Sequence, residues 1–378
     1  MPGTYEIWLT DDGGTRLADS QSRTLLTNIL YLQATRVVSG IGSFTLRVPA
    51  TFDTGLAQID NMIQVWRAPQ RSRLSLWGVY FIRRRAFSTS GAHETIELGG
   101  PCINDLLRRR IVAAYAGSSQ AEKTDFADDM MKEIVTEAIA DGVAPAPDAG
   151  TRVWNDLSVQ ADVSNGPTLT MSFAWANLLT LSGGGALADI AKASREAGTE
   201  VFFNVAPSNL SATSIDFEFR TYTGQPGTDR TIAGVTFDQV KGNMGSPSLT
   251  EDYTEEVNYV YAGGQGEGIS RNVRQVYDSD RYGLSQWNRC EGFADARDEG
   301  TNNGVDAIGN DALSLGRPIR RFSMTPLDTI GAVFGTDWDV GDKVRARYRG
   351  EEFDSLIRGA TITLDRGQES ISAVTDFV

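Results

Sequence analysis

The 378-residue sequence predicts a mainly β fold with an α+β insertion in its middle. Apolar and polar residues alternate over the first hundred positions, the apolar period becomes helical after Pro101, and strand-like alternation returns from about Val240. Two β-rich ends around an α+β middle suggest a pair of similar barrels that carry insertions. The expected units are residues 1–105 (first β unit), 106–240 (α+β insertion) and 241–378 (second β unit), with a polar, partly helical insertion at about 275–318.

The N-terminal strands are short and are separated by turn signals. Asp11-Asp12-Gly13-Gly14 is typical of a hairpin-type turn, and Pro49 ends a strand whose alternate residues are apolar. Several strands at this spacing indicate a barrel or a sandwich. The expected strands are Tyr5–Leu9, Phe44–Val48, Ile63–Trp66, Leu74–Ile82 and His93–Leu98.

The first helix of the middle section follows a capping signal. Ser119 and Glu122 have the spacing of a capping box, and residues 126–139 carry an apolar helical stripe. Gly142 marks the expected end of this helix. Residues 143–150, rich in Pro, Ala and Gly, predict a loop.

A second helix and further strands complete the pattern. Residues 186–197 carry an apolar helical face, and Gly198 supplies the stop. A polar, weakly helical stretch at 287–315 interrupts the later strands. The remaining strands are expected at 201–205, 215–220, 257–261, 343–348, 356–364 and 370–374.

Charge and composition restrict the class of partner. The formal net charge is −14, which argues against a surface that wraps DNA, although DNA passage through a repelling lumen is compatible with it. Lysine occurs at only five positions, so the cations are mostly arginines, which suit fixed ion pairs and interfaces. No apolar run approaches a membrane span and the N-terminus lacks a signal-peptide pattern, so we expect a soluble chain without membrane insertion. Cys102 and Cys290 are expected to be buried free thiols, with a disulfide as the alternative.

Residue types that commonly carry catalysis are sparse. The single histidine, His93, lies in an alternating strand, which favours a surface position. Because there is only one histidine, paired-histidine zinc sites are excluded, and its surface position argues against a catalytic triad. The glycine-rich segment 262–268 follows a strand, but its spacing is not that of a dinucleotide fingerprint, and residues 269–277 alternate like a strand. A turn with positive φ is the favoured interpretation. The sequence therefore predicts no catalytic residue, no metal site and no cofactor.

One carboxylate pair leaves an enzymatic alternative open. On a helix, Asp295 and Asp298 would lie on neighbouring faces with Arg297 beside them. Such a pair could serve a carbohydrate-active or wall-degrading hydrolase, or hold a hard metal ion. Hydrolysis needs two carboxyl groups that flank a sugar, usually from different elements, so an ion-pair node that ties a helix to a sheet or subunit is favoured.

Basic clusters and tryptophans leave further alternatives. Two arginine runs are either solvated element ends or surfaces that meet an acidic partner or a sister subunit. These runs are Arg83-Arg84-Arg85 and Arg108-Arg109-Arg110. The tryptophans suggest a carbohydrate-binding module, but most lie within alternating strands, which favours core burial. They are Trp8, Trp66, Trp77, Trp154, Trp175, Trp287 and Trp338.

Three motifs carry a family resemblance in their order and spacing. The first motif is the strand 257–261 with its glycine-rich turn, and it includes Gly263, Gly266 and Arg271. The second motif is 289–298, which includes Glu291, Asp295, Arg297 and Asp298. The third motif is 338–344, which includes Gly341 and Asp342. Together with residues 42–49 and 99–110 they resemble the tail-tip hub proteins of tailed phages, the siphovirus Gp37-like family. That family is similar to the baseplate hub of contractile tails and to the N-terminal half of type VI secretion spike proteins.

The resemblance implies a homotrimeric structural hub rather than an enzyme. Each chain would contribute two tail-tube-like β-barrels, so that three chains form a pseudo-hexameric ring that adapts the six-fold tail tube to a three-fold tip. The implied partners are a distal tail or tail-tube protein, a separate spike or fibre protein, and the tape-measure protein in the lumen. DNA would only pass through, with the ring as conduit and gate for genome ejection. The expected location is the virion, at the tail tip or baseplate, after assembly in the host cytoplasm.

Overall fold

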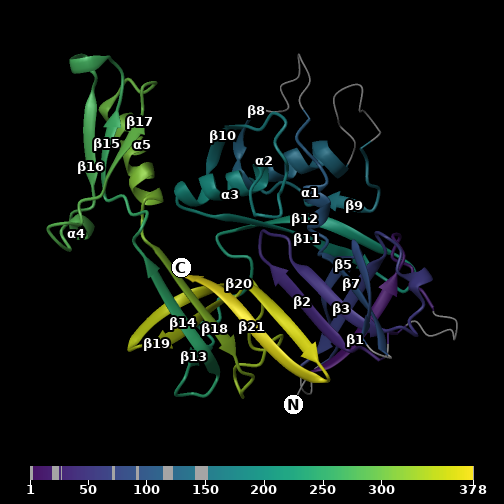
Figure 1. Cartoon of the computed structure of the whole chain (residues 1–378). Helices are drawn as coiled ribbons and strands as arrows, with labels where there is room; N and C mark the ends of the chain where they lie inside the picture. Colours follow the sequence, from purple (N-terminus) through teal and green to yellow (C-terminus); the bar gives the residue numbers. More distant parts are fainter. Residues whose placement is uncertain are drawn as a thin grey trace. The chain divides into compact units, whose positions relative to one another are not determined.

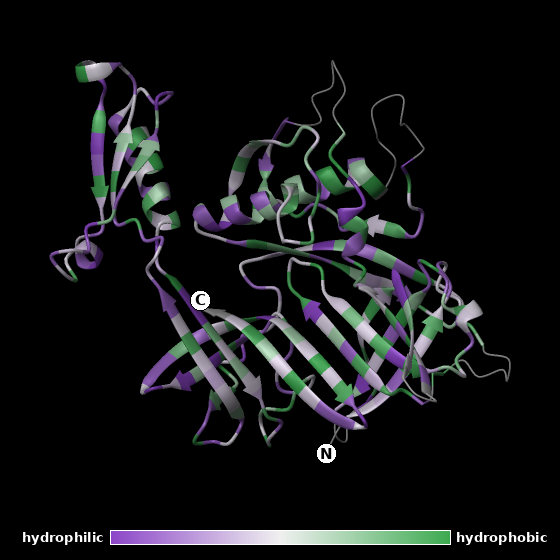
Figure 2. Ribbon diagram, in the orientation of Figure 1, coloured by the Kyte–Doolittle hydropathy of each residue, from purple (hydrophilic) through white to green (hydrophobic). Residues whose placement is uncertain are grey.

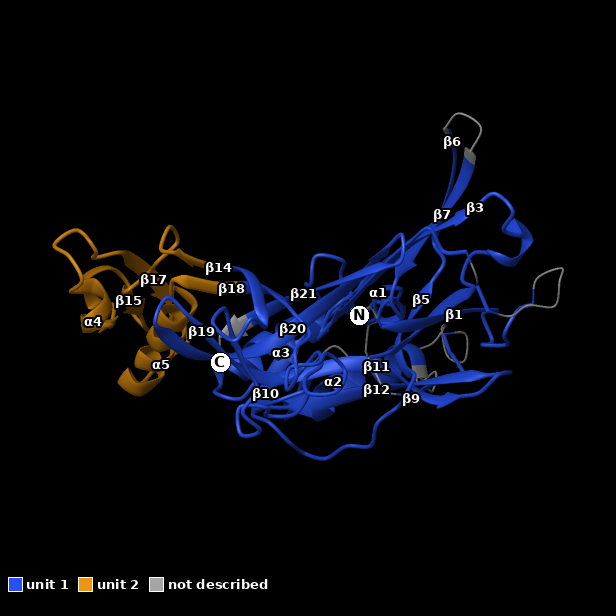
Figure 3. Ribbon diagram, turned by 90° about the horizontal axis from the view of Figure 1, so that it is seen from below, with its two compact units in different colours: residues 1–247, 323–378 blue, residues 248–322 orange. Residues whose placement is uncertain are grey.

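The computed structural model describes residues 3–18, 25–26, 28–69, 73–90, 93–113, 122–140 and 152–377. The chain divides into two compact units: residues 1–247 with 323–378 form unit 1, and residues 248–322 form unit 2 (Figure 3). Strands far outnumber helices, which confirms the mainly β class. The boundaries expected after residues 105 and 240 stay predictions. No helix among the described residues is long and apolar enough to span a membrane.

The two β-rich ends of the chain share one sheet (Figure 1). Its order is β14 (Met244–Asp252), β18 (Ile319–Pro326), β21 (Gln368–Phe377), β20 (Glu351–Asp365), β2 (Tyr31–Val37), β3 (Ser43–Pro49), β7 (His93–Pro101) and β6 (Arg84–Ser90). β19 (Lys343–Tyr348) pairs with β20, and β13 (Thr236–Asp238) pairs with β19. The junction is antiparallel, from Tyr31 opposite Asp365 to Val37 opposite Gly359. Among the strands that the structure describes, no closed barrel is found.

Alternation of apolar and polar side chains builds this sheet. In β3, Phe44, Leu46 and Val48 are buried, and the residues between them face away from the core. β20 follows the same rule around Ala360 and Ile362. Figure 2 shows the resulting stripes of hydrophobic and hydrophilic residues along the strands.

A second sheet of unit 1 is tied to the C-terminal strands by a buried charge cluster. This sheet has the order β1 (Thr4–Thr10), β4 (Met62–Ala68), β5 (Ser75–Phe81). Arg67 of β4 donates from Nε to Glu369 of β21 at 2.7 Å and from Nη1 to the carbonyl of Phe334 at 2.9 Å. Tyr5 and the backbone N–H of Gly3 also donate to Glu369. Only 3% of the Arg67 side chain and 7% of that of Glu369 are exposed, so the pair is shielded from water.

The α+β section supplies the main apolar core of unit 1. Its sheet has the order β11 (Val201–Leu210), β12 (Ile215–Thr223), β9 (Leu157–Val159), and β8 (Glu122–Phe126) pairs with β10 (Thr168–Ser172). The helices are α2 (Ala127–Val135), continued by the π-helical turn η2 (Thr136–Ala140), and α3 (Ala186–Glu196). The core joins Met130 and Ile134 of α2 and Ile190 of α3 to Phe203 and Phe219 of the sheet. The shorter elements of unit 1 are η1 (Thr54–Leu56) and α1 (Asp105–Arg108).

The start of α2 corrects one sequence expectation. Glu122 does not complete a capping box, because it begins β8 and pairs with Ser172 of β10. The helix begins after Phe126, and the buried Asp128 and Asp129 of its first turn accept hydrogen bonds from Lys132. The same two carboxylates also accept backbone N–H groups of residues 163–165. Ser119, Gly142 and the predicted loop at 143–150 lie outside the described residues.

Candidate assembly site

Unit 2 is a small sheet with one covered face. Its strands have the order β16 (Val273–Tyr277), β15 (Tyr259–Gly263), β17 (Glu291–Asp295), and β17 runs parallel to β15. α5 (Asn302–Leu315) places Val305 against Val260, Ala262 and Ala294. The remaining helical turns are η3 (Gly268–Ser270) and α4 (Ser279–Tyr282). Because side chains alternate across a strand, the motif residues Gly263 and Asp295 lie on the sheet face away from this core.

Arg271 joins the first two sequence motifs. Its Nη2 donates to the carbonyl of Gly263 at 2.8 Å and to Asp295 Oδ1 at 2.6 Å, and its Nε donates to the carbonyl of Gly264 at 3.1 Å. The guanidinium lies 5.2 Å from the ring centre of Phe293. A Cβ atom at Gly263 would lie 2.8 Å from the Arg271 guanidinium carbon, so a larger residue here would require the guanidinium to shift.

Asp295 holds a second arginine. Arg297 donates from Nε to Asp295 Oδ2 at 2.8 Å and also from Nη2. The helix expected for residues 295–298 is wrong: Asp295 ends β17, and the residues that follow form a turn. Asp295 does form ion pairs, but they tie a strand end to a turn, and Asp298 lies exposed in that turn. Hydrogen bonds from Arg297 and Arg271 lower the pKa of Asp295 to about 2 although desolvation opposes them.

This pKa gives a direct prediction for titration. The Asp295 carboxyl should titrate near pH 2 in the folded protein, and Arg297→Gln should move its pKa up toward the ordinary value, because the largest stabilising hydrogen bond is lost. The folded pKa lies below the unfolded one, so the node is complete at neutral pH and is lost only as pH falls through about 2. Carboxyl-detected NMR of both proteins measures this. An unchanged Asp295 pKa in Arg297→Gln would refute the assignment.

The other residues of the first two motifs do not contact the Arg271–Asp295 ion pair in the hydrogen bonds described below. Gly266 has φ +104°, so the expected positive-φ turn is confirmed, and β16 begins only at Val273. Glu291 accepts a hydrogen bond from Arg289 Nε at 2.7 Å. Asp298 lies in the turn after β17 with its side chain exposed. The structure therefore brings together part of the predicted set: Gly263, Arg271, Asp295 and Arg297.

Gly341 and Asp342 form a different node, in unit 1. Gly341 has φ +93° and lies in the turn before β19. The buried Asp342 accepts from Thr228 N at 2.6 Å, from Arg230 Nε at 2.8 Å and from Asp339 N at 2.9 Å. It therefore anchors the loop around Thr228 to the start of β19.

The two arginine runs are partly engaged within the chain. Arg83 and Arg109 both pair with Asp60, at 2.8 Å and 2.9 Å. Arg108 and Arg109 pair with the buried Asp105. The other contacts are those of Arg84 with Glu97, Arg85 with the carbonyl of Ala57, and Arg110 with the ring of Trp154. The structure thus gives each arginine a partner in its own chain, and an intermolecular role stays a prediction.

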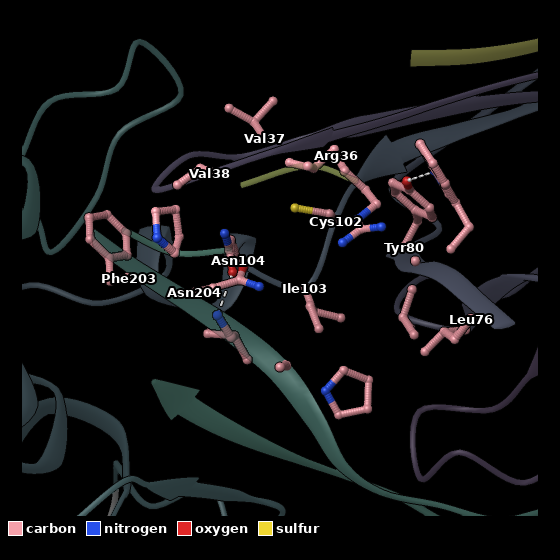
Figure 4. A pocket seen from close by; sticks show the side chains of 18 of the residues that line it. Arg36, Val37, Val38, Leu76, Tyr80, Cys102, Ile103, Asn104, Phe203 and Asn204 are labelled. Atoms are coloured by element: carbon pink, nitrogen blue, oxygen red, sulfur yellow. Dashed lines mark hydrogen bonds between the residues drawn. The ribbon is translucent and has the colours of Figure 1, made fainter. Parts of the chain in front are cut away.

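A cavity of about 240 Å³ in unit 1 holds the thiol of Cys102 (Figure 4). Arg36 at its wall pairs with Asp339 at 3.1 Å. Asn104 donates to the carbonyl of Gly40 and accepts from the backbone N–H of Val205. Burial raises the pKa of Cys102 to about 11, so the thiol is protonated at neutral pH. Both cysteines are free thiols, as predicted, but as whole residues they are half-buried rather than fully buried.

The thiol yields a second testable prediction. In a Cys290→Ser variant, Cys102 should react with a disulfide reagent at pH 8 at least roughly a hundredfold more slowly than an ordinary cysteine, because its thiolate fraction is that much smaller. Absorbance of the released thiolate measures the rate, and the same protein in denaturant is the control. Equal rates in the folded and denatured proteins would contradict the burial of this thiol.

An aromatic cluster at the Tyr259 end of β15, opposite the Gly263 end that carries the node, was missed by sequence reasoning. Tyr259 stacks on Tyr277 with ring centres 5.0 Å apart. The Arg289 guanidinium lies 3.8 Å from the Tyr259 ring centre and donates to the hydroxyl of Tyr261 at 2.9 Å. The alternation of tyrosine in 257–261 was the available signal, but it did not reveal which strands would lie beside it.

The fold is that of phage tail proteins. The 43 kDa tail protein of prophage MuSo2 from Shewanella oneidensis matches 99% of this chain over 98% of its own, with a TM-score of 0.57 and 12% identity. The tail protein from Neisseria meningitidis MC58 matches 99% of this chain over 96% of its own, with a TM-score of 0.55 and 11% identity. A chain of the lidded Francisella PdpA–VgrG complex matches 98% of this chain over 52% of its own, with a TM-score of 0.51 and 8% identity.

The sequence profile of the siphovirus ReqiPepy6 Gp37-like protein family matches residues 5–375. The chain therefore belongs to this family, which confirms the resemblance drawn from the three motifs. Comparison with curated proteins gives no match.

Proposed function

We propose that this chain is a structural hub at the distal end of a phage tail. The observation that carries the proposal is the family match over residues 5–375, supported by a fold shared with two tail proteins over nearly their whole length. A ring protein needs rigid β units more than it needs a reactive site. The β2–β20 junction and the buried Arg67–Glu369 pair give unit 1 that rigidity.

The proposed assembly is a homotrimer. Each chain supplies two tail-tube-like β units, one from each half of the shared sheet, and three chains close a pseudo-hexameric ring between the six-fold tube and a three-fold tip. The net charge of −14 supports a conduit for genome ejection, because a negative wall does not retain the phosphate backbone.

The proposed partners lie on both sides of the ring and in its lumen. They are a distal tail or tail-tube protein, a separate spike or fibre protein, and the tape-measure protein. The arginine runs at 83–85 and 108–110 and the motif residues of unit 2 are proposed contact points. Arg84 suits this role, since 66% of its side chain is exposed.

The hydrolase alternative gains little from the geometry. Asp295 is held by two arginines, and its pKa of about 2 makes it a poor proton donor at neutral pH. A muramidase assay on the parent chain and on Asp295→Asn/Asp298→Asn separates the two functions. The hub proposal expects no activity in either protein. Activity in the parent that the double variant loses would establish the hydrolase.

A carbohydrate-binding module gains limited support from the tryptophans. The core burial expected for most tryptophans holds fully for Trp338 and Trp77, whereas Trp175 and Trp287 are 52% and 84% exposed. The other three, Trp8, Trp66 and Trp154, are half-buried. Two exposed rings do not by themselves form a sugar platform.

A phage with an early stop codon in this gene tests the hub role. A structural hub is required for tail construction, so electron microscopy should show heads without complete tails. Complementation with the intact gene is the control. Normal tails on the mutant particles would overturn the proposal.

A further inference from the structure

Unit 1 contains a second cavity, of about 440 Å³, where the α+β section meets the C-terminal strands. The end of α3 and the start of β11 line one side, and β19 and β20 line the other. Its charged lining residues are Arg195, Lys343, Arg358 and Glu200. Arg358 is paired with Glu200, and two carboxylates behind the lining, Asp354 and Asp229, lie beside Lys343, so the unbalanced positive charge of this cavity centres on Arg195.

Arg358 forms a fixed wall of the cavity. Its Nη1 and Nη2 donate to the two oxygens of Glu200 at 3.0 Å and 2.9 Å, and its guanidinium lies 4.8 Å from the Phe202 ring centre. Only 19% of Arg358 and 17% of Glu200 are exposed, so this bidentate pair is well ordered. The Arg358 side chain is therefore already ordered before any ligand binds, so binding costs no further side-chain entropy at this wall.

Arg195 and Lys343 are the cations with binding capacity left. The described ion pair of Arg195 is a 4.0 Å approach to Glu200, and 57% of its side chain is exposed. Lys343 Nζ lies 3.4 Å from Asp354 and 3.9 Å from Asp229, longer than the hydrogen bonds of Arg358. Both side chains can therefore turn toward an incoming anion with little loss of internal hydrogen bonding.

We propose that this cavity binds the carboxylate side chains of an acidic protein segment, held between Arg195 and Lys343. Arg195, 57% exposed and 4.0 Å from a carboxylate that Arg358 already holds, is the group that selects an anion, and a volume of about 440 Å³ admits aspartate or glutamate side chains. The site does not depend on ring closure, so it can be tested on the purified chain whether or not the hub proposal holds.

A labelled octaglutamate peptide is the probe, with binding measured by fluorescence anisotropy. The net negative charge of the chain repels this peptide in general, so binding reports a local positive site. We expect saturable binding that weakens with salt. Arg195→Gln should weaken it about tenfold, the effect of one charge-assisted hydrogen bond.

Lys192→Gln is the matched control. Lys192 is on the same helix, is 51% exposed and pairs with Glu196, but it does not line the cavity. Its loss removes the same charge and should leave peptide binding unchanged. Lys343→Gln provides a second test from the opposite wall, with circular dichroism as the check on folding of each variant.

Two outcomes would overturn the proposal. One is absence of octaglutamate binding, or equal weakening by Arg195→Gln and Lys192→Gln, which would indicate a diffuse charge effect. The other is displacement of the peptide by free glutarate at an equal carboxylate concentration, which would make the ligand a small dicarboxylate. Displacement only at more than about a hundredfold excess supports a protein segment as the ligand, because linked carboxylates bind together.

Discussion

Arg67→Met is expected to lower the free energy of unfolding of unit 1 by about 3–5 kcal/mol. The substitution leaves Glu369 buried with its strongest partner removed, and it strips a donor from the carbonyl of Phe334. Both effects arise in a site where only 3% of the arginine side chain is exposed. Urea denaturation followed by tryptophan fluorescence measures the change.

Arg84→Met is the matched control for this prediction. Arg84 makes an ion pair of the same length, 2.7 Å, with Glu97, but 66% of its side chain is exposed. Its loss should cost less than about 1 kcal/mol. Equal losses for the two variants would show that burial of the Arg67 pair does not matter.

The same cluster sets a pH dependence. Burial by itself raises the pKa of Glu369, but hydrogen bonds from Arg67, Tyr5 and Gly3 outweigh it and hold that pKa below its ordinary value. Its contribution to stability is present above the unfolded pKa and is lost as pH falls through the lower folded pKa. In Arg67→Met this part of the acid sensitivity should be reduced.

Asp342→Ala should destabilise unit 1 by about 2–4 kcal/mol. The carboxylate accepts three hydrogen bonds in a buried turn. Alanine would leave three donors without their acceptor: the N–H groups of Thr228 and Asp339 and the Arg230 guanidinium. Hydrogen exchange should show the loss first in residues 228–231 and at the start of β19.

Asp12→Ala provides the comparison, because Asp12 lies exposed in a turn of the same unit. Its effect should stay within about 0.5 kcal/mol. A loss for Asp342→Ala as small as that for Asp12→Ala would contradict the anchoring role of Asp342.

Most strands could be predicted because one face of each is buried. β3 and β20 show this alternation in the sequence itself, and α3 shows a helical apolar face with a glycine stop. β2 was missed because only Leu32 and Ala34 of it are buried, and its pairing with β20 comes from the far end of the chain. α5 had little local signal, since it contains Gly304 and Gly309.

Tertiary packing explains this glycine content. A Cβ atom at Gly309 would lie 2.7 Å from Val276 Cγ2, so α5 approaches the sheet too closely for a larger residue. Contacts of this kind cannot be recognised from helix propensity.

The sequence predicted which residues belong to the candidate site better than it predicted how they are arranged. The motif order identified Arg271, Asp295 and Arg297, which the structure brings together. The helix expected there was wrong because the parallel pairing of β17 with β15 overrides the local spacing of two aspartates. The Arg67–Glu369 pair was missed because its members are 302 residues apart. An arginine within an apolar strand does not indicate which carboxylate will pair with it.

The central claim is that this chain forms a three-fold ring at the distal end of a phage tail. Cryo-electron microscopy of intact tails from the phage that carries it is the most direct test, because assembly partners are then present. The proposal predicts three copies of the chain around a central pore at the tail tip. Six copies along the tube, or a peripheral position without a pore, would contradict it.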